Sequence, residues 1–355
     1  MKKVLVLTKF GEWNESSRIR FYQYYPGLEE SGTVIKTVPL FSDSISETFY
    51  HSYRSNTFST LFGSLKRLFV LLIEKKYDVL WLDTEAIPYL PFLFESFILP
   101  LDKKLILDLG DATHYKYEKN KRFLTRWILD DKISGLVQRA DSIITRNSNL
   151  FTYANSVNPG KVVLIPPALH PSLIQKKLSS FSDPEKTEII LGWTGSPYSS
   201  RFLYSLYGPL KELSRSFRLK IILIGAEESI DLPIRKTHYQ FSREDEMQIL
   251  DSIDIGLMPL PRSLRETGSS GYKVMKYMAR GKAVLASDIG GARDLIHHGE
   301  NGFLCKNADD WYLSMRLFIE SPSNISLYGE KAFQSVKSKN SFDSNLKKIA
   351  GEIFS

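Results

Sequence analysis

Short runs of leucine, isoleucine and valine recur along the chain, and segments with the spacing of amphipathic helices separate them. In the first half these runs occupy residues 4–7, 34–38, 77–82, 104–109, 142–145 and 161–165. In the second half they occupy residues 189–193, 220–224, 255–258 and 283–286. Strands that alternate with helices pair in parallel and receive helices on their faces. The pattern therefore predicts an α/β protein with doubly wound sheets.

Helical segments lie between these runs and after the last of them. The main ones cover residues 17–31, 58–75, 132–140, 272–280 and 340–354. Glycine follows the first and the fourth, as Gly32 and Gly281. Glycine just past the last helical turn is a typical helix C-cap.

The chain is too long for one ordinary hydrophobic core. It has 355 residues, and residues 175–186 (QKKLSSFSDPEK) form a polar, proline-containing stretch that suits an interdomain linker. We predict an N-terminal domain at 1–175, a C-terminal domain at 187–338 and a final helix at 339–355 able to pack back on the N-terminal domain. Two doubly wound domains that face each other across a cleft would hold ligands at the carboxyl ends of their strands.

Charge and composition narrow the classes of partner. The chain has 47 Lys and Arg against 40 Asp and Glu, which favours anionic partners. The basic residues are scattered and no nucleic-acid-binding signature is present, so we expect no nucleic acid. Phosphorylated small molecules and an anionic membrane surface remain. Cys305, the single cysteine, excludes an internal disulfide and fits a cytoplasmic protein.

Four features of the sequence bear on membranes and export. The opening MKKVLVLTKF is interpreted as a first strand rather than a secretory signal, because its apolar run ends at Lys9. No window of 18 uncharged apolar residues predicts a membrane span. Residues 58–75 form a basic amphipathic helix that suits an anionic lipid surface. Residues 89–101 (YLPFLFESFILPL) are expected to pack in the core of the N-terminal domain.

A strand, a glycine turn and a helix follow one another at residues 190–203 (ILGWTGSPYSSRFL). Gly195 lets the backbone approach a ligand, and free N–H groups after Ser196 would attract phosphate. Arg201 would add a cation. An ordinary strand–turn–helix connection explains the same residues equally well.

A second anion-binding pattern runs from the strand at 255–258 through a loop rich in Ser and Gly to the helix at 272–280. The backbone N–H groups of Ser269, Ser270 and Gly271 are expected to point at phosphate oxygens, with Lys273 supplying charge. Taken alone, Lys273 would fit a solvated helix surface as well.

The run KVMKYMARGKAVLASDIGGARDLIHHGENGFL, which starts at Lys273, closely resembles the donor-binding signature of family 4 (group 1) retaining glycosyltransferases, which have the GT-B fold. The upstream pieces GWTGSP, SREDEMQILDSIDIGLMPL, SSRIRFYQYYP and DLGDA fit the same family. The resemblance thus spans nearly the whole chain. It implies a nucleotide-diphosphate-sugar donor in the C-terminal domain, an acceptor on the N-terminal domain and transfer with retention.

The resemblance also implies that neither a metal nor a cofactor is required, because cationic side chains and helix dipoles meet the diphosphate charge. A saccharide or lipid-linked acceptor in cell-surface polysaccharide synthesis is the expected setting. The enzyme would then be cytoplasmic and peripheral at the inner face of the membrane.

Two positions depart from the family pattern. Most members carry two glutamates eight residues apart, the second of which contacts the donor ribose, and this chain has Gly268 and Lys276 there. A lysine donates hydrogen bonds but cannot accept them, so Lys276 either contacts phosphate as a donor-binding residue or points away. The departures leave two alternatives open: a catalytically impaired GT-B subunit that binds a saccharide or partner enzyme, and a GT-B sugar epimerase.

Candidate acceptor-side residues follow the first strand, in the loop FGEWNESSRIR at 10–20. Ser16, Ser17, Arg18 and Arg20 are polar groups in this loop, and the resemblance falls most directly on Arg18. The two serines also suit a helix N-cap.

Asp108, Asp111 and His114 follow the buried strand at 104–109. Asp111 and His114 are the predicted catalytic groups beside Arg18, since a carboxylate or an imidazole can bind or deprotonate an acceptor hydroxyl. Alternatively, Asp111 caps the next helix and His114 is exposed.

Overall fold

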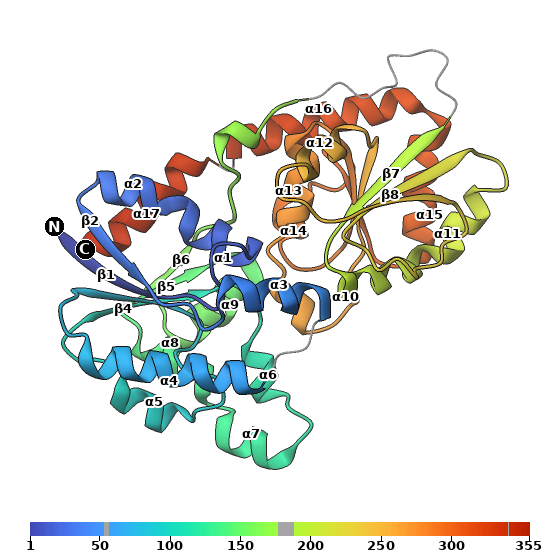
Figure 1. The fold of residues 1–355 in the computed structure, drawn as a ribbon. Coiled ribbons are helices and arrows are strands. Elements are labelled where there is room, and N and C mark those ends of the chain that lie inside the picture. Colours follow the sequence, from blue (N-terminus) through green and yellow to red (C-terminus); the bar gives the residue numbers. More distant parts are fainter. Residues whose placement is uncertain (53–56, 177–187, 340) are drawn as a thin grey trace. The chain divides into compact units, whose positions relative to one another are not determined.

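The computed structural model describes residues 1–52, 57–176, 188–339 and 341–355. They form two compact units (Figure 1). The N-terminal unit comprises Met1–Pro167, Ser263–Ser270 and Asp343–Ser355, and the C-terminal unit comprises Ala168–Arg262 and Gly271–Phe342. None of the helices in the described residues is long and apolar enough to cross a membrane.

The N-terminal unit contains a six-stranded parallel sheet in the order β2-β1-β3-β4-β5-β6. Its strands are β1 (Lys2–Leu7), β2 (Thr33–Thr37), β3 (Val79–Asp83), β4 (Lys104–Leu109), β5 (Ser142–Thr145) and β6 (Val162–Leu164). Every residue of β3 is buried, as expected for a central parallel strand covered on both faces.

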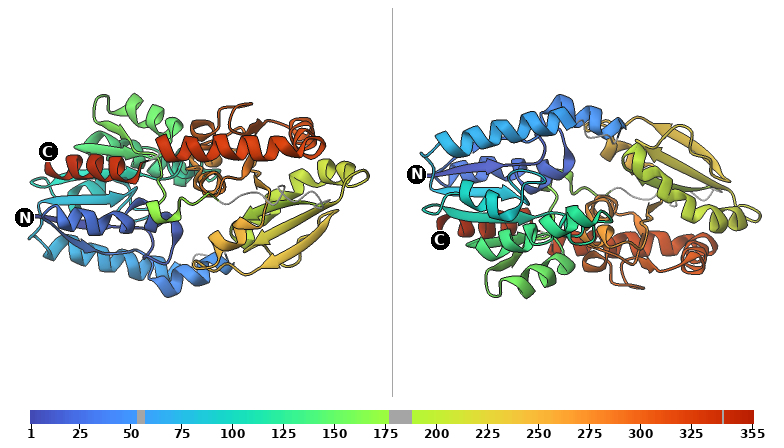
Figure 2. Two further views of the ribbon diagram at one scale, coloured as in Figure 1. Left: turned by 90° about the horizontal axis from the view of Figure 1, so that it is seen from above. Right: turned by 90° about the horizontal axis from the view of Figure 1, so that it is seen from below.

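Helices cover both faces of this sheet, with α2 and α17 above it and α4, α5 and α8 below it in Figure 1. The helices of the unit are α1 (Glu15–Arg20), α2 (Tyr25–Glu30), α3 (Asp43–Ser52), α4 (Thr57–Ile73), α5 (Phe92–Ile98), α6 (His114–Glu118), α7 (Phe123–Leu129), α8 (Lys132–Arg139), α9 (Ser148–Val157) and α17 (Phe342–Phe354). The view from below in Figure 2 brings α4 and α5 into sight on their face.

The C-terminal unit contains a second six-stranded parallel sheet in the order β12-β11-β10-β7-β8-β9. Its strands are β7 (Ile189–Thr194), β8 (Leu219–Ile224), β9 (Arg235–Tyr239), β10 (Ile255–Met258), β11 (Ala283–Ser287) and β12 (Phe303–Cys305). Its helices are α10 (Pro197–Ser200), α11 (Tyr207–Leu213), α12 (Glu246–Asp251), α13 (Tyr272–Ala279), α14 (Ala292–Leu295), α15 (Ala308–Glu320) and α16 (Pro322–Lys339).

The predicted α/β class with two doubly wound sheets is confirmed, and two expected segments are corrected. The helix expected at 17–31 is broken at Phe21, whose φ of −128° and ψ of −72° are not helical. The chain restarts as α2, with Pro26 in its first turn, where the missing N–H of proline costs nothing. Residues 89–101 do not pack wholly in the core, because several large apolar side chains of α5 face solvent.

The chain divides differently from the expected boundaries. Residues 263–270 group with the N-terminal unit, where the side-chain amide of Asn147 donates hydrogen bonds to the backbone oxygens of Thr267 (3.0 Å) and Ser269 (2.9 Å). Residues 168–175 group with the C-terminal unit. From Asp343 on, α17 belongs to the N-terminal unit, where Asn345 Nδ2 donates to the oxygen of Pro166 at 2.7 Å. Residues 177–186 of the expected linker lie outside the described residues.

Candidate functional site

Gly195 and Lys273, two predicted donor-binding residues, meet at the carboxyl end of β7. The ammonium of Lys273 lies 5.1 Å from the centroid of the Trp193 ring. A Cβ on Gly195 would stand 2.5 Å from Lys273 Nζ and 2.6 Å from atoms of the Trp193 ring. Glycine at 195 thus leaves room for the Lys273 ammonium and the Trp193 ring, and a larger residue would displace one of them.

The amino end of α13 lies in the same unit and carries Lys273 in its first turn. Its N-cap is Gly271, whose φ of +75° lies in the left-handed region that glycine tolerates best. Glycine has no side chain to accept hydrogen bonds from the first-turn N–H groups, and the helix dipole places partial positive charge there. Backbone and lysine together make this end of α13 electropositive.

Tyr277 fixes α13 against the ends of two strands. Its hydroxyl accepts a hydrogen bond from the N–H of Thr194 at 3.1 Å and donates one to the backbone oxygen of Leu257 at 3.3 Å. Its ring lies against Gly256, where a Cβ would come within 2.2 Å of the ring. Tyr277 therefore holds the position of the helix that bears Lys273.

Lys276 is paired inside the C-terminal unit. Its side chain is 3% exposed, and its Nζ lies 2.6 Å from Glu246 Oε1 of α12. Thr194 Oγ1 donates to the same oxygen at 2.5 Å. Position 276 lacks the carboxylate that the resemblance led us to expect, but the carboxylate of Glu246 lies next to its lysine. Glu246 belongs to the family-like segment SREDEM, yet the sequence assigns it no role, because only the packing of α12 on α13 reveals the pair.

The other predicted donor-binding residues of this unit make local contacts. Ser196 is the N-cap of α10, and its hydroxyl donates to Ser199 Oγ at 3.2 Å. α10 has four residues with Pro197 in its first turn, so it offers fewer N–H groups than the sequence pattern suggested. The guanidinium of Arg201 stacks on the Tyr198 ring, 3.7 Å from its centroid.

The loop that contains Ser269 and Ser270 packs within the N-terminal unit. A Cβ on Gly268 would stand 2.1 Å from the backbone nitrogen of Ala112, so no side chain fits there. The packing therefore accounts for glycine at this position, where the resemblance led us to expect glutamate. The backbone oxygen of Ser269 accepts from Asn147, as described above.

Asp111 and His114 lie beyond the carboxyl end of β4 and differ in their surroundings. The Asp111 side chain is 52% exposed and lies 3.9 Å from Lys9 Nζ. Burial opposes its ionisation, but Lys9 and a hydrogen bond donated by Thr113 outweigh it and lower the pKa of Asp111. The carboxyl is thus ionised at neutral pH.

His114 is buried, so its alternative interpretation as an exposed residue is wrong. Its ring stacks on Tyr153, with centroids 3.8 Å apart and an interplanar angle of 10°. Burial lowers the pKa of His114 to about 4, against the attraction of Asp111. The imidazole is therefore neutral at pH 7, and its Nε2 has no hydrogen-bond partner within the described part of the chain.

Two arginines of the first loop separate by environment. Arg18 is half-buried and donates to the backbone oxygen of Trp13 at 3.2 Å. Arg20 is buried and lies 2.7 Å from Asp83 and 2.8 Å from Asp108. Arg146 also pairs with Asp108. Burial opposes the ionisation of Asp108, but Arg146 and Arg20 outweigh it and hold the pKa of Asp108 below its usual value.

This network ties the carboxyl ends of β3 and β4 together, which gives Arg20 and Asp108 structural roles. The side chain that caps α1 is that of Asn14, which accepts from the N–H of Ser16 at 3.0 Å. The interpretation of Ser16 and Ser17 as the N-cap is therefore wrong. Ser17 Oγ instead accepts from the N–H of Phe10 at 3.2 Å.

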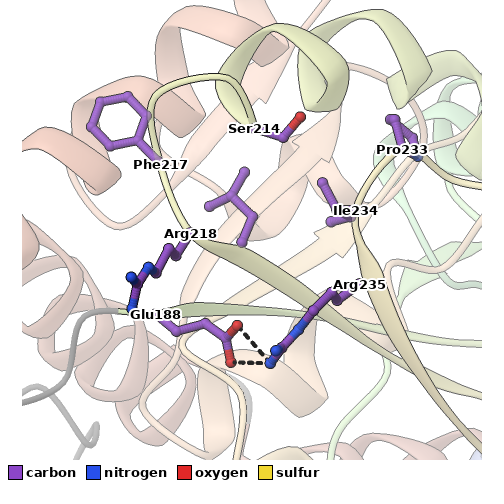
Figure 3. A pocket seen from close by; sticks show the side chains of 8 residues that line it. Glu188, Ser214, Phe217, Arg218, Pro233, Ile234 and Arg235 are labelled. Carbon is purple, nitrogen blue, oxygen red and sulfur yellow. Dashed lines mark hydrogen bonds and ion pairs between the residues drawn. The ribbon is translucent and has the colours of Figure 1, made fainter.

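A surface hollow of about 620 Å³ lies at the amino ends of strands in the C-terminal sheet, opposite to the end that carries Gly195 and Lys273 (Figure 3). It is lined near the amino ends of β7, β8 and β9 by residues that include Glu188, Leu219 and Arg235. Glu188 pairs with Arg235 at 2.9 Å across it. Ligands of doubly wound sheets bind at the carboxyl ends of the strands. The hollow is therefore separate from the Gly195–Lys273 site.

Comparisons with known proteins concern the family and the fold. A family model described as "Glycosyl transferases group 1" matches residues 203–320, which confirms the resemblance in that segment. A search of curated proteins found no match.

Solved structures match along the whole chain. HepE of Anabaena, in complex with UDP and glucose, has a TM-score of 0.70 at 15% identity, covering 100% of both chains. Sucrose-phosphate synthase of Thermosynechococcus elongatus has a TM-score of 0.71 at 12% identity, covering 100% of this chain and 98% of that one. WaaG, a glycosyltransferase involved in lipopolysaccharide biosynthesis, has a TM-score of 0.71 at 12% identity, covering 99% of each chain. The two parallel six-stranded sheets thus have the GT-B fold.

Proposed function

From a C-terminal unit of the group 1 glycosyltransferase type within a GT-B fold, we propose that this protein transfers a sugar from a nucleotide-diphosphate-sugar to a saccharide or lipid-linked acceptor, with retention. Cell-surface polysaccharide synthesis is the proposed setting, in the cytoplasm at the inner face of the membrane. A uridine nucleotide is the first donor to test, because HepE was solved with UDP and with UDP-glucose.

The observation that carries the proposal is the position of Lys273 across Gly195, at the amino end of α13. Transfer leaves negative charge on the departing diphosphate, and fixed cations and helix N-termini stabilise such charge. In this proposal the lysine and the backbone of α13 supply that stabilisation and no metal is needed. Ser196, Arg201 and Ser270 remain proposed donor contacts. The backbone N–H of Ser269, predicted to point at phosphate, instead donates to the oxygen of Glu266 at 3.1 Å.

We assign to Glu246 the role of the glutamate expected at position 276, which is to contact the donor ribose. Lys276 and Thr194 both donate to its Oε1, which fixes the orientation of the carboxylate. A carboxylate has two oxygens and several acceptor positions, so Oε2 can accept from a donor hydroxyl. Lys276 then acts through Glu246 as a positioning residue.

The acceptor side is proposed to use Asp111, His114 and Arg18. Asp111 is ionised and half-exposed, so it is suited to accept a hydrogen bond from an acceptor hydroxyl. The neutral His114 is buried beside it and is suited to orient rather than to protonate. Arg18 would meet an anionic part of the donor or acceptor.

Binding of UDP, measured by isothermal titration calorimetry, tests the donor site. Lys273→Ala is expected to weaken UDP binding by about tenfold to a hundredfold, since a charge-assisted contact is lost. Lys211→Ala, which removes an exposed lysine from α11, is the matched control and should leave the affinity unchanged. Equal affinities in the two variants would remove Lys273 from the site.

The same assay separates the alternatives. A folded protein that binds no nucleotide or nucleotide sugar would favour the impaired subunit that binds a saccharide or a partner enzyme, for which Gly268 and Lys276 are the motivation.

An NMR time course with the donor alone tests the epimerase alternative, because it detects epimerisation without an acceptor. With an acceptor present, the anomeric coupling of the product shows whether configuration is retained.

A further inference from the structure

The helix α4 turns its apolar side toward solvent. Large side chains spaced three and four residues apart lie on this side, and Phe58 is 80% exposed. They are Phe58, Leu61, Phe62, Leu65, Phe69 and Leu72. Apolar residues at this spacing normally face the protein core, so α4 is oriented opposite to an ordinary surface helix.

Buried contacts on the inner side hold α4 in this orientation. Arg67 is buried and donates hydrogen bonds to the backbone oxygens of Ala86 (2.8 Å), Glu85 (3.2 Å) and Thr8. Gly63 faces the backbone of Leu40, where a Cβ would stand 2.1 Å from the oxygen. Rotating the helix would leave the buried hydrogen-bond acceptors unpaired, which is costly.

The helix α5 repeats this arrangement. Its inward residue Glu95 is buried, pairs with Lys132 of α8, and accepts from the N–H groups of Ala86 (2.6 Å) and Ile87 (3.1 Å). Its outward residues Leu93, Phe94 and Phe97 are exposed, Phe97 by 79%. A polar residue therefore fixes the inner side while aromatic side chains face out.

The helix α7 adds a third apolar group, in which Phe123, Leu124, Trp127 and Ile128 are exposed, Trp127 by 70%. Packing connects the three helices: α4 contacts α5, α8 contacts both α5 and α6, and α6 contacts α7. All three lie on the lower side of the N-terminal unit in Figure 1 and come into view from below in Figure 2. We call the exposed apolar residues of α4, α5 and α7 the outer helix face.

Positive charge accompanies the outer helix face. Exposed basic residues lie within its helices or next to their ends: Lys66, Lys75, Lys76, Lys121, Arg122 and Arg126. Within α4, α5 and α7, all fully described, Glu95 is the one acidic residue, and it is buried in an ion pair. Next to the helix ends, Glu74, which pairs with Lys36, and the exposed Asp130 and Asp131 offset part of the positive charge. Aromatic and aliphatic side chains among exposed cations complement the surface of an anionic bilayer.

We propose that the outer helix face docks this protein on an anionic lipid bilayer, with its apolar side chains in the headgroup region and its cations against lipid phosphates. A symmetric contact between two copies would bring the same cations together, which disfavours that occupant. This inference rests on the proposed function in that it gives the peripheral location a surface. Vesicle binding and UDP binding are measured separately, so either can fail alone.

Flotation with phosphatidylcholine vesicles, with and without phosphatidylglycerol, tests the proposal. The full chain should float with the anionic vesicles and be released by salt. The triple variant Phe62→Ser, Phe97→Ser and Trp127→Ser should bind the vesicles more weakly by at least about tenfold. Each of the three helices then loses one exposed apolar side chain that the bilayer would cover. Leu313→Ser, on an exposed leucine of α15, is the matched control and should bind like the wild type.

A second variant isolates the charge. Arg122→Gln with Arg126→Gln should weaken binding to anionic vesicles on the order of tenfold and leave binding to neutral vesicles unchanged. Unchanged urea midpoints and UDP affinity show that the variants are folded.

Three results would overturn the proposal. In one, the triple variant floats like the wild type. In another, wild-type binding is the same with and without anionic lipid. In the third, sedimentation shows a dimer that the triple variant dissociates while neither protein binds vesicles, which would make the face a self-association surface.

Discussion

Lys276, at a position where the resemblance predicts a carboxylate, is paired with Glu246 of a neighbouring helix. The ammonium and the carboxylate are almost fully buried and lie 2.6 Å apart. Breaking a buried pair by removing one partner leaves an uncompensated charge, whereas removing both does not. The lysine is therefore expected to matter for folding as well as for the donor site.

Lys276→Met should lower the free energy of unfolding by about 3–5 kcal/mol, because Glu246 would stay buried without its partner. The double variant Lys276→Met with Glu246→Leu should recover most of that loss, while donor binding stays weak because the carboxylate is gone. Urea denaturation and UDP titration measure the two effects. A double variant as unstable as the single one would contradict the role of the ion pair.

His114 makes stability depend on pH. The unfolded imidazole has a pKa of about 6.5, and burial lowers the pKa of the folded one to about 4. Between these values the unfolded state binds more protons, so the free energy of unfolding falls as the pH falls through this window. In His114→Phe, which keeps a ring against Tyr153, this dependence should be flatter.

Urea unfolding across that pH window checks the expectation, with His170→Gln as the control because His170 is exposed. A pH dependence that is the same in His114→Phe as in the wild type would show that another group causes it.

At the scale of elements, glycines decide how closely loops approach one another. Gly268 ends a short 3-10 helix, Arg265–Gly268, that lies against the backbone of Ala112. The loop at 263–270 is also held by Asn147, which caps α9 through the N–H of Leu150 at 2.8 Å. Position 268 is therefore limited to glycine by the packing of the loop.

Gly268→Ala should destabilise the protein by about 1–3 kcal/mol, because the new methyl overlaps a backbone atom that cannot move freely. Gly208→Ala is the matched control. Gly208 lies in α11, where a Cβ would meet nothing within 4 Å, and alanine favours a helix more than glycine does. Thermal unfolding should shift down for the first variant and remain level or rise for the second.

Elements also show which parts of the fold could be predicted. Apolar runs located β4, β5 and β10 at their observed bounds. β9 (RKTHY) and β12 were missed, because an edge strand carries polar residues and a three-residue strand has no readable period. The outward side of α5 was assigned to the core, because composition does not reveal that Glu95 occupies the inner side.

For the candidate site, sequence placed Gly195 and Lys273 in two separate segments, and packing brought them together. The Lys276–Glu246 pair was beyond reach, since α12 and α13 had to be docked before the two side chains could meet. The resemblance to the family drew attention to position 276, and the fold identified Glu246 as the partner of its lysine.

At the scale of the whole molecule, each sheet has its own hydrophobic core. Leu107 and Ile143 lie in the core of the N-terminal sheet, and Leu191 and Leu285 lie in that of the C-terminal sheet. Two cores match the expected size of a domain in a chain of 355 residues. The chain passes between the two units more than once, because the N-terminal unit takes three segments of the sequence.

That discontinuity has a consequence for synthesis on the ribosome. Every strand of the N-terminal sheet has been translated by residue 164, but residues 263–270 and 343–355 of the same unit come later. At roughly 5–20 residues per second, the last segment follows the first by roughly 10–40 s. The N-terminal unit therefore stays incomplete while the C-terminal unit is synthesised. We expect a chaperone that binds nascent chains to bind the N-terminal unit during that interval.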